Sequence, residues 1–394
     1  MANNPRKEEL WQIQGDALRE PSEILCQKYE HSGLYAESLK FSADEPFVEL
    51  LGALGITLFV TREYEHLVLA LTVDTSGKLR QSHTHLPHPS GLVVDRKNNS
   101  IYIAATRNPN QIWEFKPLEG LQERKDRSLP KTCPAYLMPT RTKFMSGSYY
   151  THDLALIGGE LYGNSVGQNA ITKIEFDSPH MDRLVWWPKS LDRDRGKTET
   201  RQNYIQLNSI AGGARLEESF FSASSDKPSA RRPGHHNYPV DKRGVIFSGA
   251  TRDVHARGLT RPHSARLAGG QIWVDNSGYG EFGYANDGEF VPIIKLPGWT
   301  RGLCIHKNIA FVGVSRVLPR FRHYAPGLKE TSKECGLYAI NIKTGVVLGH
   351  LKWPNGNQIF AIDWISNAVT PGFVFTNLKA ATQATKDIFY SYKI

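Results

Sequence analysis

A short pattern of residues returns about every fifty positions along the chain, and this repeat constrains the fold more than any other feature. The runs 91–95, 100–106 and 111–115 are rich in β-branched and aromatic residues and are separated by turn residues, which is typical of a β-meander. Similar units open near residues 47, 88, 152, 208, 263, 301 and 359. Repeats of this length, each one a four-stranded meander, are typical of a β-propeller.

The number of unit openings predicts an all-β fold, a β-propeller with seven blades, and six blades are the alternative. A pair of β-sandwich domains is the competing fold, but it would not require a shared opening motif. Ring closure removes exposed sheet edges. We expect residues 1–40 to form an N-terminal extension with a short helix over 7–18 and a closing strand around 33–40. Residues 41–394 then form a single propeller domain.

The composition is that of a folded chain, with 40% hydrophobic and 22% charged residues. Its longest nearly apolar run, residues 50–60, is too short to span a bilayer. The first residues lack the apolar segment of a secretory signal. These features predict a soluble, cytoplasmic protein with no membrane partner.

The 48 lysine and arginine residues exceed the 39 acidic residues, which gives a net charge of +9 and favours anionic partners. The basic residues are scattered rather than gathered in a stripe, and this disfavours nucleic acid and leaves a small anionic substrate as the expected partner. The cysteines (Cys26, Cys133, Cys304 and Cys335) are too far apart for a zinc motif, so buried free thiols are expected. The oligomeric state is left open.

Several stretches of the chain resemble a bacterial family of conserved hypothetical proteins that is catalogued as a domain of unknown function. The stretches that carry the resemblance, which spans about residues 47 to 365, are 133–137, 151–156, 206–208, 257–266, 270–281, 296–303, 311–315 and 335–336. The resemblance implies a propeller-like fold but no particular reaction.

The chain departs from the family pattern at three openings. Gln206-Leu-Asn-Ser209 stands where the family usually reads His-Leu-Asn-Gly, and Gln358 stands where a glutamate is common. His88 precedes a proline where the family more often has another residue. A function tied to these positions would be altered in this chain.

Polar residues open the innermost strand of each expected blade and should converge at one mouth of the central channel, where ligands commonly bind. These residues are His88, His152, Asn208, His263, Arg301 and Gln358. Three neutral imidazoles suit a divalent transition metal such as Zn, Mn or Fe, so His88, His152 and His263 are the predicted metal ligands. Asp153 is expected to orient a neighbouring imidazole. The alternative is that each histidine simply bonds to the backbone of a neighbouring blade.

The remaining opening residues have predicted catalytic or binding roles. Arg301 would bind a carboxylate or phosphate with both arms of its guanidinium, while Asn208 and Gln358 would orient substrate or water. Tyr150 is a candidate proton donor or stacking surface. The sequence therefore predicts a metal-assisted lyase or hydrolase that acts on a small anionic substrate. The alternative is a non-catalytic propeller that binds a ligand or a protein partner, and the insertions at 215–243 and 316–331 would suit a lid or a docking surface in either case.

Overall fold

Strands dominate the structure, a computed structural model in which only two α-helices, α4 (Leu34–Leu39) and α5 (Glu45–Leu54), occur among the described residues. The described residues are 34–107, 110–118, 135–145, 147, 149–178, 182–194, 204–229, 231, 233, 235–328 and 334–373. The helix expected over residues 7–18 lies outside them. Neither α-helix is long and apolar enough to cross a membrane.

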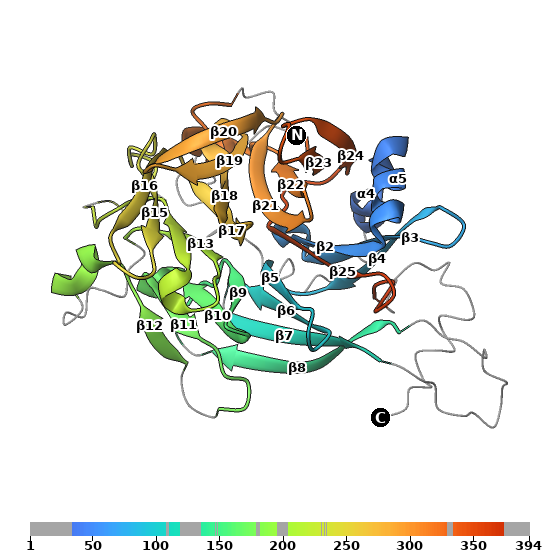
Figure 1. Cartoon of the computed structure of the whole chain (residues 1–394), viewed down its shortest axis with the longest axis horizontal. Helices are drawn as coiled ribbons and strands as arrows, with labels where there is room; N and C mark the ends of the chain where they lie inside the picture. Colours follow the sequence, from blue (N-terminus) through green and yellow to red (C-terminus); the bar gives the residue numbers. More distant parts are fainter. Residues whose placement is uncertain are drawn as a thin grey trace, which may run out of the picture.

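The described strands group into six antiparallel meanders of four strands each, and each meander is one blade (Figure 1). Blades 1 to 3, written from the innermost strand outward, are β25 (Ala361–Ser366), β2 (Ile56–Arg62), β3 (Leu67–Val73), β4 (Leu79–His85); β5 (Pro89–Asp95), β6 (Ser100–Ala105), β7 (Asn110–Pro117), β8 (Leu137–Met145); and β9 (Leu154–Ile157), β10 (Glu160–Ser165), β11 (Ala170–Lys173), β12 (Arg183–Trp186). Blades 4 to 6 are β13 (Leu207–Ala211), β14 (Phe220–Ala223), β15 (Gly244–Ser248), β16 (Val254–Leu259); β17 (Pro262–Ala268), β18 (Gln271–Asn276), β19 (Glu281–Asn286), β20 (Glu289–Lys295); and β21 (Trp299–His306), β22 (Ile309–Ser315), β23 (Gly336–Asn341), β24 (Val347–Lys352). Blades 4 and 5 join into one sheet through a single parallel bridge between Arg257 and Glu289.

The innermost strands contact one another in the order β25, β5, β9, β13, β17, β21 and back to β25, so the blades close into a ring (Figure 1). This confirms the predicted propeller. The described strands form six blades, which is the alternative, and the expected seventh blade is not among them. The openings near residues 47 and 359 belong to the same blade, because β25 from the C-terminal part pairs along its whole length with β2 from the N-terminal part.

The closing strand expected around residues 33–40 is wrong, because residues 34–39 form helix α4. A two-residue strand, β1 (Ser42–Ala43), pairs instead with β24 at the outer edge of blade 6. The unit expected to open as a strand near Phe47 is helix α5. Its ends are set locally: the Asp44 side chain accepts a hydrogen bond from the Phe47 N–H, and Gly55 ends the helix in the left-handed conformation.

Both faces of most inner strands are buried, because each blade packs between two others. All seven residues of β2 are buried. A strand that is buried on both faces does not show the alternation of polar and apolar residues by which half-buried strands are recognised in a sequence. Helix α5 adds Phe47 to the core, where its ring packs edge-on against Phe311 at 6.2 Å between centroids. Cys304 and Cys335 are buried free thiols, as expected for these two cysteines, and burial raises their pKa values.

Side chains hold the loops that lead into the innermost strands. The Asn169 side chain accepts hydrogen bonds from the Tyr204 and Ile205 N–H groups, and the Asn276 side chain accepts one from Thr260. In blade 1, the Nδ1 atom of His66 likewise accepts a hydrogen bond from the His88 N–H. These loops enter the ring at its axis and therefore determine where the candidate site residues lie.

Candidate functional site

Strand register shows which residues occupy equivalent positions at the axis. Pro89, Leu207, Pro262 and Trp299 each pair with the last residue of the second strand of their blade. Asn208 and His263 follow Leu207 and Pro262 directly, so these two predicted site residues are equivalent, as expected.

The strand register shows that two predicted site residues, His88 and Arg301, do not occupy the position that Asn208 and His263 share. His88 precedes Pro89 and therefore corresponds to Arg261, while Ser90 takes the position of His263. Arg301 lies one residue beyond that position, which Thr300 occupies. The residues before the openings share a left-handed backbone, which L-residues rarely adopt without a structural reason: φ is 46° at His88, 50° at Tyr150, 49° at Gln206 and 55° at Arg261.

Arg301 and His152 both contact Phe360. The Arg301 guanidinium lies 3.3 Å from the centroid of the Phe360 ring, and the His152 ring meets the same ring edge-on at 5.4 Å between centroids. Arg301 is only 6% exposed, and its buried Nη2 atom has no hydrogen-bond partner in the described part of the chain. Three innermost strands or their entrances therefore meet here, those of blades 1, 3 and 6.

Two further arginines, Arg107 and Arg261, act electrostatically on Arg301 and His152. Burial lowers the pKa of Arg301 to about 9, with Glu63 opposing and Arg261 and Arg107 reinforcing the shift. Burial also lowers the pKa of His152 to about 3, and the charge of Arg301 contributes. The site is therefore cationic through its arginines while this imidazole stays neutral. We use the name axial cluster for Glu63, Arg107, His152, Arg261, His263, Arg301 and Phe360.

His263 is buried, and its tautomer follows from its partners. Its Nδ1 atom lies 2.9 Å from the carbonyl oxygen of Arg261 and 2.9 Å from the hydroxyl of Ser277. A carbonyl only accepts, so Nδ1 carries the proton and donates. Burial and then the charges of Arg301 and Arg261 lower the pKa of His263 well below its usual value. The neutral ring therefore keeps its lone pair on Nε2, the atom that is suited to accept a proton or bind a cation.

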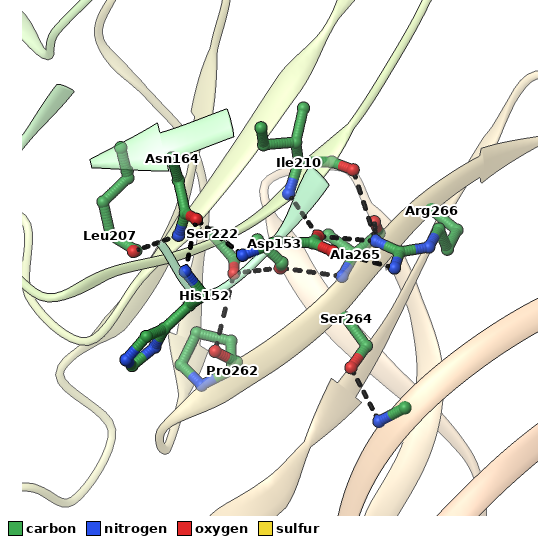
Figure 2. Close-up of polar contacts among 12 residues, drawn as sticks. His152, Asp153, Asn164, Leu207, Ile210, Ser222, Pro262, Ser264, Ala265 and Arg266 are labelled. Carbon is green, nitrogen blue, oxygen red and sulfur yellow. Dashed lines mark hydrogen bonds and ion pairs between the residues drawn. The ribbon is translucent and has the colours of Figure 1, made fainter. Parts of the chain in front are cut away.

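His152 is held in place through its backbone. The Asn164 side-chain oxygen accepts the N–H groups of His152 at 2.9 Å and Asp153 at 2.6 Å, and its amide donates to the Leu207 carbonyl at 2.6 Å (Figure 2). Blade 3 is thus tied to blade 4 at the point where His152 enters the axial cluster. The Nδ1 atom of His152 is buried, and no described residue forms a hydrogen bond with it.

Asp153 does not orient an imidazole, which corrects the expected role. Its carboxylate instead accepts two hydrogen bonds from Arg266, 2.7 and 3.1 Å long, and one from the Ile210 N–H at 2.9 Å (Figure 2). The three residues come from blades 3, 4 and 5. The hydrogen bonds of the Asp153 carboxylate therefore connect the innermost strands of three successive blades.

The other predicted residues lie near the axis with definite partners. Asn208 donates to the Ser224 hydroxyl and the Pro262 carbonyl, so its amide joins blades 4 and 5. Gln358 is buried, and within the described ranges its side-chain oxygen has no hydrogen-bond partner. Tyr150 is half-buried and interacts with the charge of Arg107. None of these contacts tests the predicted roles in substrate binding.

The three predicted metal ligands do not form a compact set. His88 lies beside Glu63, with 3.8 Å between Nδ1 and Oε1, and its ring packs against His66. His152 and His263 interact with each other. Over the ranges that the structure describes, no three histidine, cysteine, aspartate or glutamate side chains are close enough to hold a metal ion. The metal site stays a prediction, and nothing proposed below depends on it.

Two insertions pack against Arg261, and both belong to regions predicted as a lid or docking surface. Tyr238 from the β14–β15 connection and Tyr324 from the β22–β23 connection share an apolar cluster with Trp299. The Arg261 guanidinium lies 4.2 Å from the centroid of the Tyr324 ring and donates to the Gln206 side chain. The described parts of both insertions thus pack near the entrances of blades 5 and 6, at Arg261 and Trp299.

Acidification should destabilise the fold through its neutral imidazoles. The pKa of His152 is about 3 and burial lowers that of His83 to about 4, so the folded chain stays unprotonated where the unfolded chain binds protons. Stability therefore falls as the pH drops through about 6.5, the usual histidine value. When the pH falls from 7.5 to 5.5, the free energy of unfolding should decrease less in His152→Gln than in wild type. We expect the two decreases to differ by about 1 kcal/mol.

Urea unfolding at both pH values measures this difference. His236→Gln, at an exposed loop histidine, is the control and should behave as wild type. Equal losses in wild type and folded His152→Gln would contradict the burial of a neutral imidazole at this position.

The sequence analysis missed Glu63, Arg107, Arg261 and Phe360. Arg261 was within reach, because it stands two residues before His263 as Gln206 stands two before Asn208. Glu63 and Arg107 follow second strands rather than opening a blade, so no opening motif points to them. Phe360 has no polar group and could be recognised only from its contacts with Arg301 and His152.

Comparisons with known proteins support the fold and identify the family. No curated protein matches the sequence. A subunit of a nidogen/laminin complex is 10% identical with a TM-score of 0.52, and the alignment covers 79% of this chain and 98% of that one. A protein of unknown function from Bacteroides caccae is also 10% identical, with a TM-score of 0.49 and coverage of 79% and 99%. The model of the family described as Domain of unknown function (DUF4915) matches residues 45–374, and the chain belongs to this family.

Proposed function

We propose that the chain is a propeller enzyme of the hydrolase or lyase type that binds a small anionic substrate in the axial cluster. The observation that carries the proposal is Arg301, a buried guanidinium whose Nη2 atom has no hydrogen-bond partner among the described residues. A buried charge without full pairing is costly, and a carboxylate or phosphate would supply the missing acceptor. Arg261 and Arg107 add to the positive field at the same place.

The two imidazoles supply the proton-transfer groups of the proposed reaction. His152 and His263 are neutral and lie within the field of Arg301, which lowers the pKa of both. A bound anion would offset that field and raise both pKa values toward neutrality, where a general base is most effective. Either ring could then take a proton from water, as in hydrolysis, or from a carbon beside the anionic group, as in elimination.

One observation favours a second candidate function, the binding of an anion without catalysis. The pKa of His152 is about 3 in the free protein, and an imidazole with that pKa is a weak base at neutral pH. The two functions differ in one measurement. Catalysis requires that His152→Gln and His263→Gln lower kcat on carboxylate- or phosphate-bearing esters and lactones while leaving their binding nearly intact. A pure binding protein would turn over none of these compounds.

Replacement of Arg301 tests the anion site directly. We expect Arg301→Lys to weaken the binding of inorganic phosphate by about tenfold, because it keeps the charge but loses the planar pair of donors. Arg301→Ala should weaken it by a further factor of about ten, since a buried charged hydrogen bond is worth about 2–3 kcal/mol. Isothermal titration calorimetry measures both values.

The matched control is Arg215→Ala, which removes an arginine that is largely exposed and pairs with Glu218 on the surface. It should leave phosphate affinity unchanged. Unchanged affinity in a folded Arg301→Ala variant would show that Arg301 is structural and would end the proposal.

Metal analysis tests the predicted ligands His88, His152 and His263. If they bind a metal, purified protein incubated with Zn, Mn or Fe(II) will hold about one ion per chain, and folded His152→Ala and His263→Ala will not. Occupancy should fall as the pH drops through the range where the imidazoles take up protons. Wild-type protein that stays metal-free after each incubation would contradict the predicted metal site, and the proposed acid–base role of the imidazoles, which needs no metal, would be unaffected.

A further inference from the structure

Asn208 in blade 4 occupies the position that His152 has in blade 3 and His263 has in blade 5. In each of these blades a residue with a left-handed backbone stands two positions earlier, namely Tyr150, Gln206 and Arg261. His263 interacts with both His152 and Arg301. Because the innermost strand of blade 4 lies between those of blades 3 and 5, Asn208 enters the axis between the two histidines.

The orientation of the Asn208 amide follows from its partners. Its Nδ2 atom donates to the Pro262 carbonyl at 3.0 Å and to the Ser224 hydroxyl at 3.1 Å. A carbonyl only accepts, so the nitrogen must face Pro262 and the Oδ1 atom must face away from it. Asn208 is only 2% exposed, and no described residue donates to this oxygen. Folded proteins rarely leave a buried acceptor unpaired, so a bound molecule is the expected source of the donor.

Arg301 has the opposite deficit, because its buried Nη2 atom is a donor that lacks an acceptor among the described residues. One ligand could meet both needs if it carried an anionic group and a hydrogen-bond donor. Arg301 and Arg261 both act on His263, which lies at the entrance next to Asn208, and their charges disfavour a positive group on the ligand. A hydroxyl group donates without a charge and therefore suits the Asn208 oxygen better than an ammonium group.

We infer that the ligand of the axial cluster carries a hydroxyl group beside its anionic group, and that the Oδ1 atom of Asn208 accepts the hydrogen bond of this hydroxyl. The inference rests on the proposed anion site and narrows its ligand class to hydroxylated carboxylates or phosphates. Asn208 would thus distinguish such a ligand from an anion of the same size that lacks the hydroxyl, because the latter leaves the buried oxygen unpaired.

Matched anions test the inference on the full-length protein. Lactate, alanine and propionate share one carbon skeleton and carry a hydroxyl, an ammonium or a hydrogen beside the carboxylate. Glycerol phosphate and propyl phosphate give the comparison for phosphates. We expect at least one hydroxylated probe to bind about fivefold or more tightly than its deoxy partner in calorimetry, as one net hydrogen bond between uncharged groups requires. A preference in the carboxylate set alone or in the phosphate set alone identifies the anionic group, and either supports the inference.

Two variants separate the acceptor from the bond that joins blades 4 and 5, and each has a precedent in this chain. Ser90 occupies the equivalent position in blade 2, where its hydroxyl donates to the Thr151 carbonyl of blade 3 at 2.7 Å. Asn208→Ser should therefore keep the bond to Pro262, but it lacks the amide oxygen and should bring the hydroxyl preference down to about one.

Asn208→His should keep most of the hydroxyl preference. At the equivalent position in blade 5, the Nδ1 atom of His263 contacts the Ser277 hydroxyl, as the Asn208 amide contacts Ser224, and its Nε2 atom keeps a lone pair. A neutral imidazole at position 208 would thus retain an acceptor. Asn286→Ala, at an exposed asparagine that donates to Asp287, is the control and should bind every probe as wild type does.

The outcomes distinguish this inference from the proposed function. Equal affinities for hydroxylated and deoxy probes, with inorganic phosphate still bound, would overturn the inference, assign the Asn208 oxygen to water and leave the anion site standing. Tighter binding of alanine than of lactate would overturn the hydroxyl in favour of an ammonium group. A preference that survives in folded Asn208→Ser would overturn the role of Asn208. Absence of binding of every probe, inorganic phosphate included, would overturn both proposals, and the wild-type comparison requires no variant to fold.

Discussion

A chain that ends at residue 356, before β25, will not reach the folded state. β25 is the innermost strand of blade 1 and pairs with β2 from Ile56–Ser366 to Thr61–Ala361. Its loss, with the residues that lead into it, removes five buried apolar side chains, Ile359, Phe360, Ala361, Ile362 and Ile365. At about 2 kcal/mol each, their burial is worth about 10 kcal/mol, which equals the whole stability of a typical domain.

The same truncation opens the ring. Asp363 in β25 accepts the Val94 N–H of blade 2, and the Trp364 indole donates to the Ile305 carbonyl of blade 6, so this strand joins blade 1 to both neighbours. Without it, β2 would lose its hydrogen-bonded neighbour and expose an unpaired edge. We expect the truncated protein to lose its strand signal in far-ultraviolet circular dichroism and its cooperative thermal transition.

A chain that ends at residue 373 is the control, because it keeps every described residue, and it should unfold as the full chain does. A cooperative transition in the shorter chain, within a few degrees of the full chain, would contradict closure through β25. The comparison tests the closure itself, since both variants remove C-terminal residues and only one removes the strand.

Replacement of Asp153 by alanine should lower the free energy of unfolding by about 3 kcal/mol. The side chain of Asp153 is 5% exposed and that of Arg266 is 20% exposed, so the substitution leaves a largely buried guanidinium without its partner. It also removes the acceptor of the Ile210 N–H. Urea unfolding of wild type and variant measures the loss.

A double variant shows whether the unpaired charge causes the effect. Asp153→Ala with Arg266→Met removes both charges and should regain at least half of the lost stability, as replacement of both partners of buried ion pairs by apolar residues often does. Glu218→Ala breaks the exposed pair with Arg215 and should cost less than about 0.5 kcal/mol. A loss below about 1 kcal/mol in Asp153→Ala, or no recovery in the double variant, would show that the ion pair does not hold blades 3 and 5 together.

The repeat in the sequence predicted the fold class, since turn residues and runs of β-branched residues are local signals that each blade carries within itself. It could not give the blade number. The segments of β2 and β25 each have the sequence pattern of a separate strand. Only their pairing in the closed ring shows that they belong to one blade. The helix at 45–54 was mistaken for a strand because its apolar residues were read without the Asp44 and Gly55 signals at its ends.

The candidate site was likewise predicted only in part from the sequence. The polar residues that open the blades could be found in the sequence, and His152, His263 and Arg301 do interact at the axis. The register that separates His88 and Arg301 from the other openings could not be found there, because it depends on which residues pair between the first two strands of each blade, and the composition does not mark these pairs.

The sequence by itself determined that the chain is built from repeated four-stranded meanders with polar openings, because β-propensity and turn residues act over a few neighbouring positions. The tertiary structure alone decided how many blades close the ring and which side chains meet at its centre. Glu63, Arg107, Arg261 and Arg301 come from segments far apart in the sequence. Their interaction depends on distance in space and on burial, and both arise only when the ring is closed.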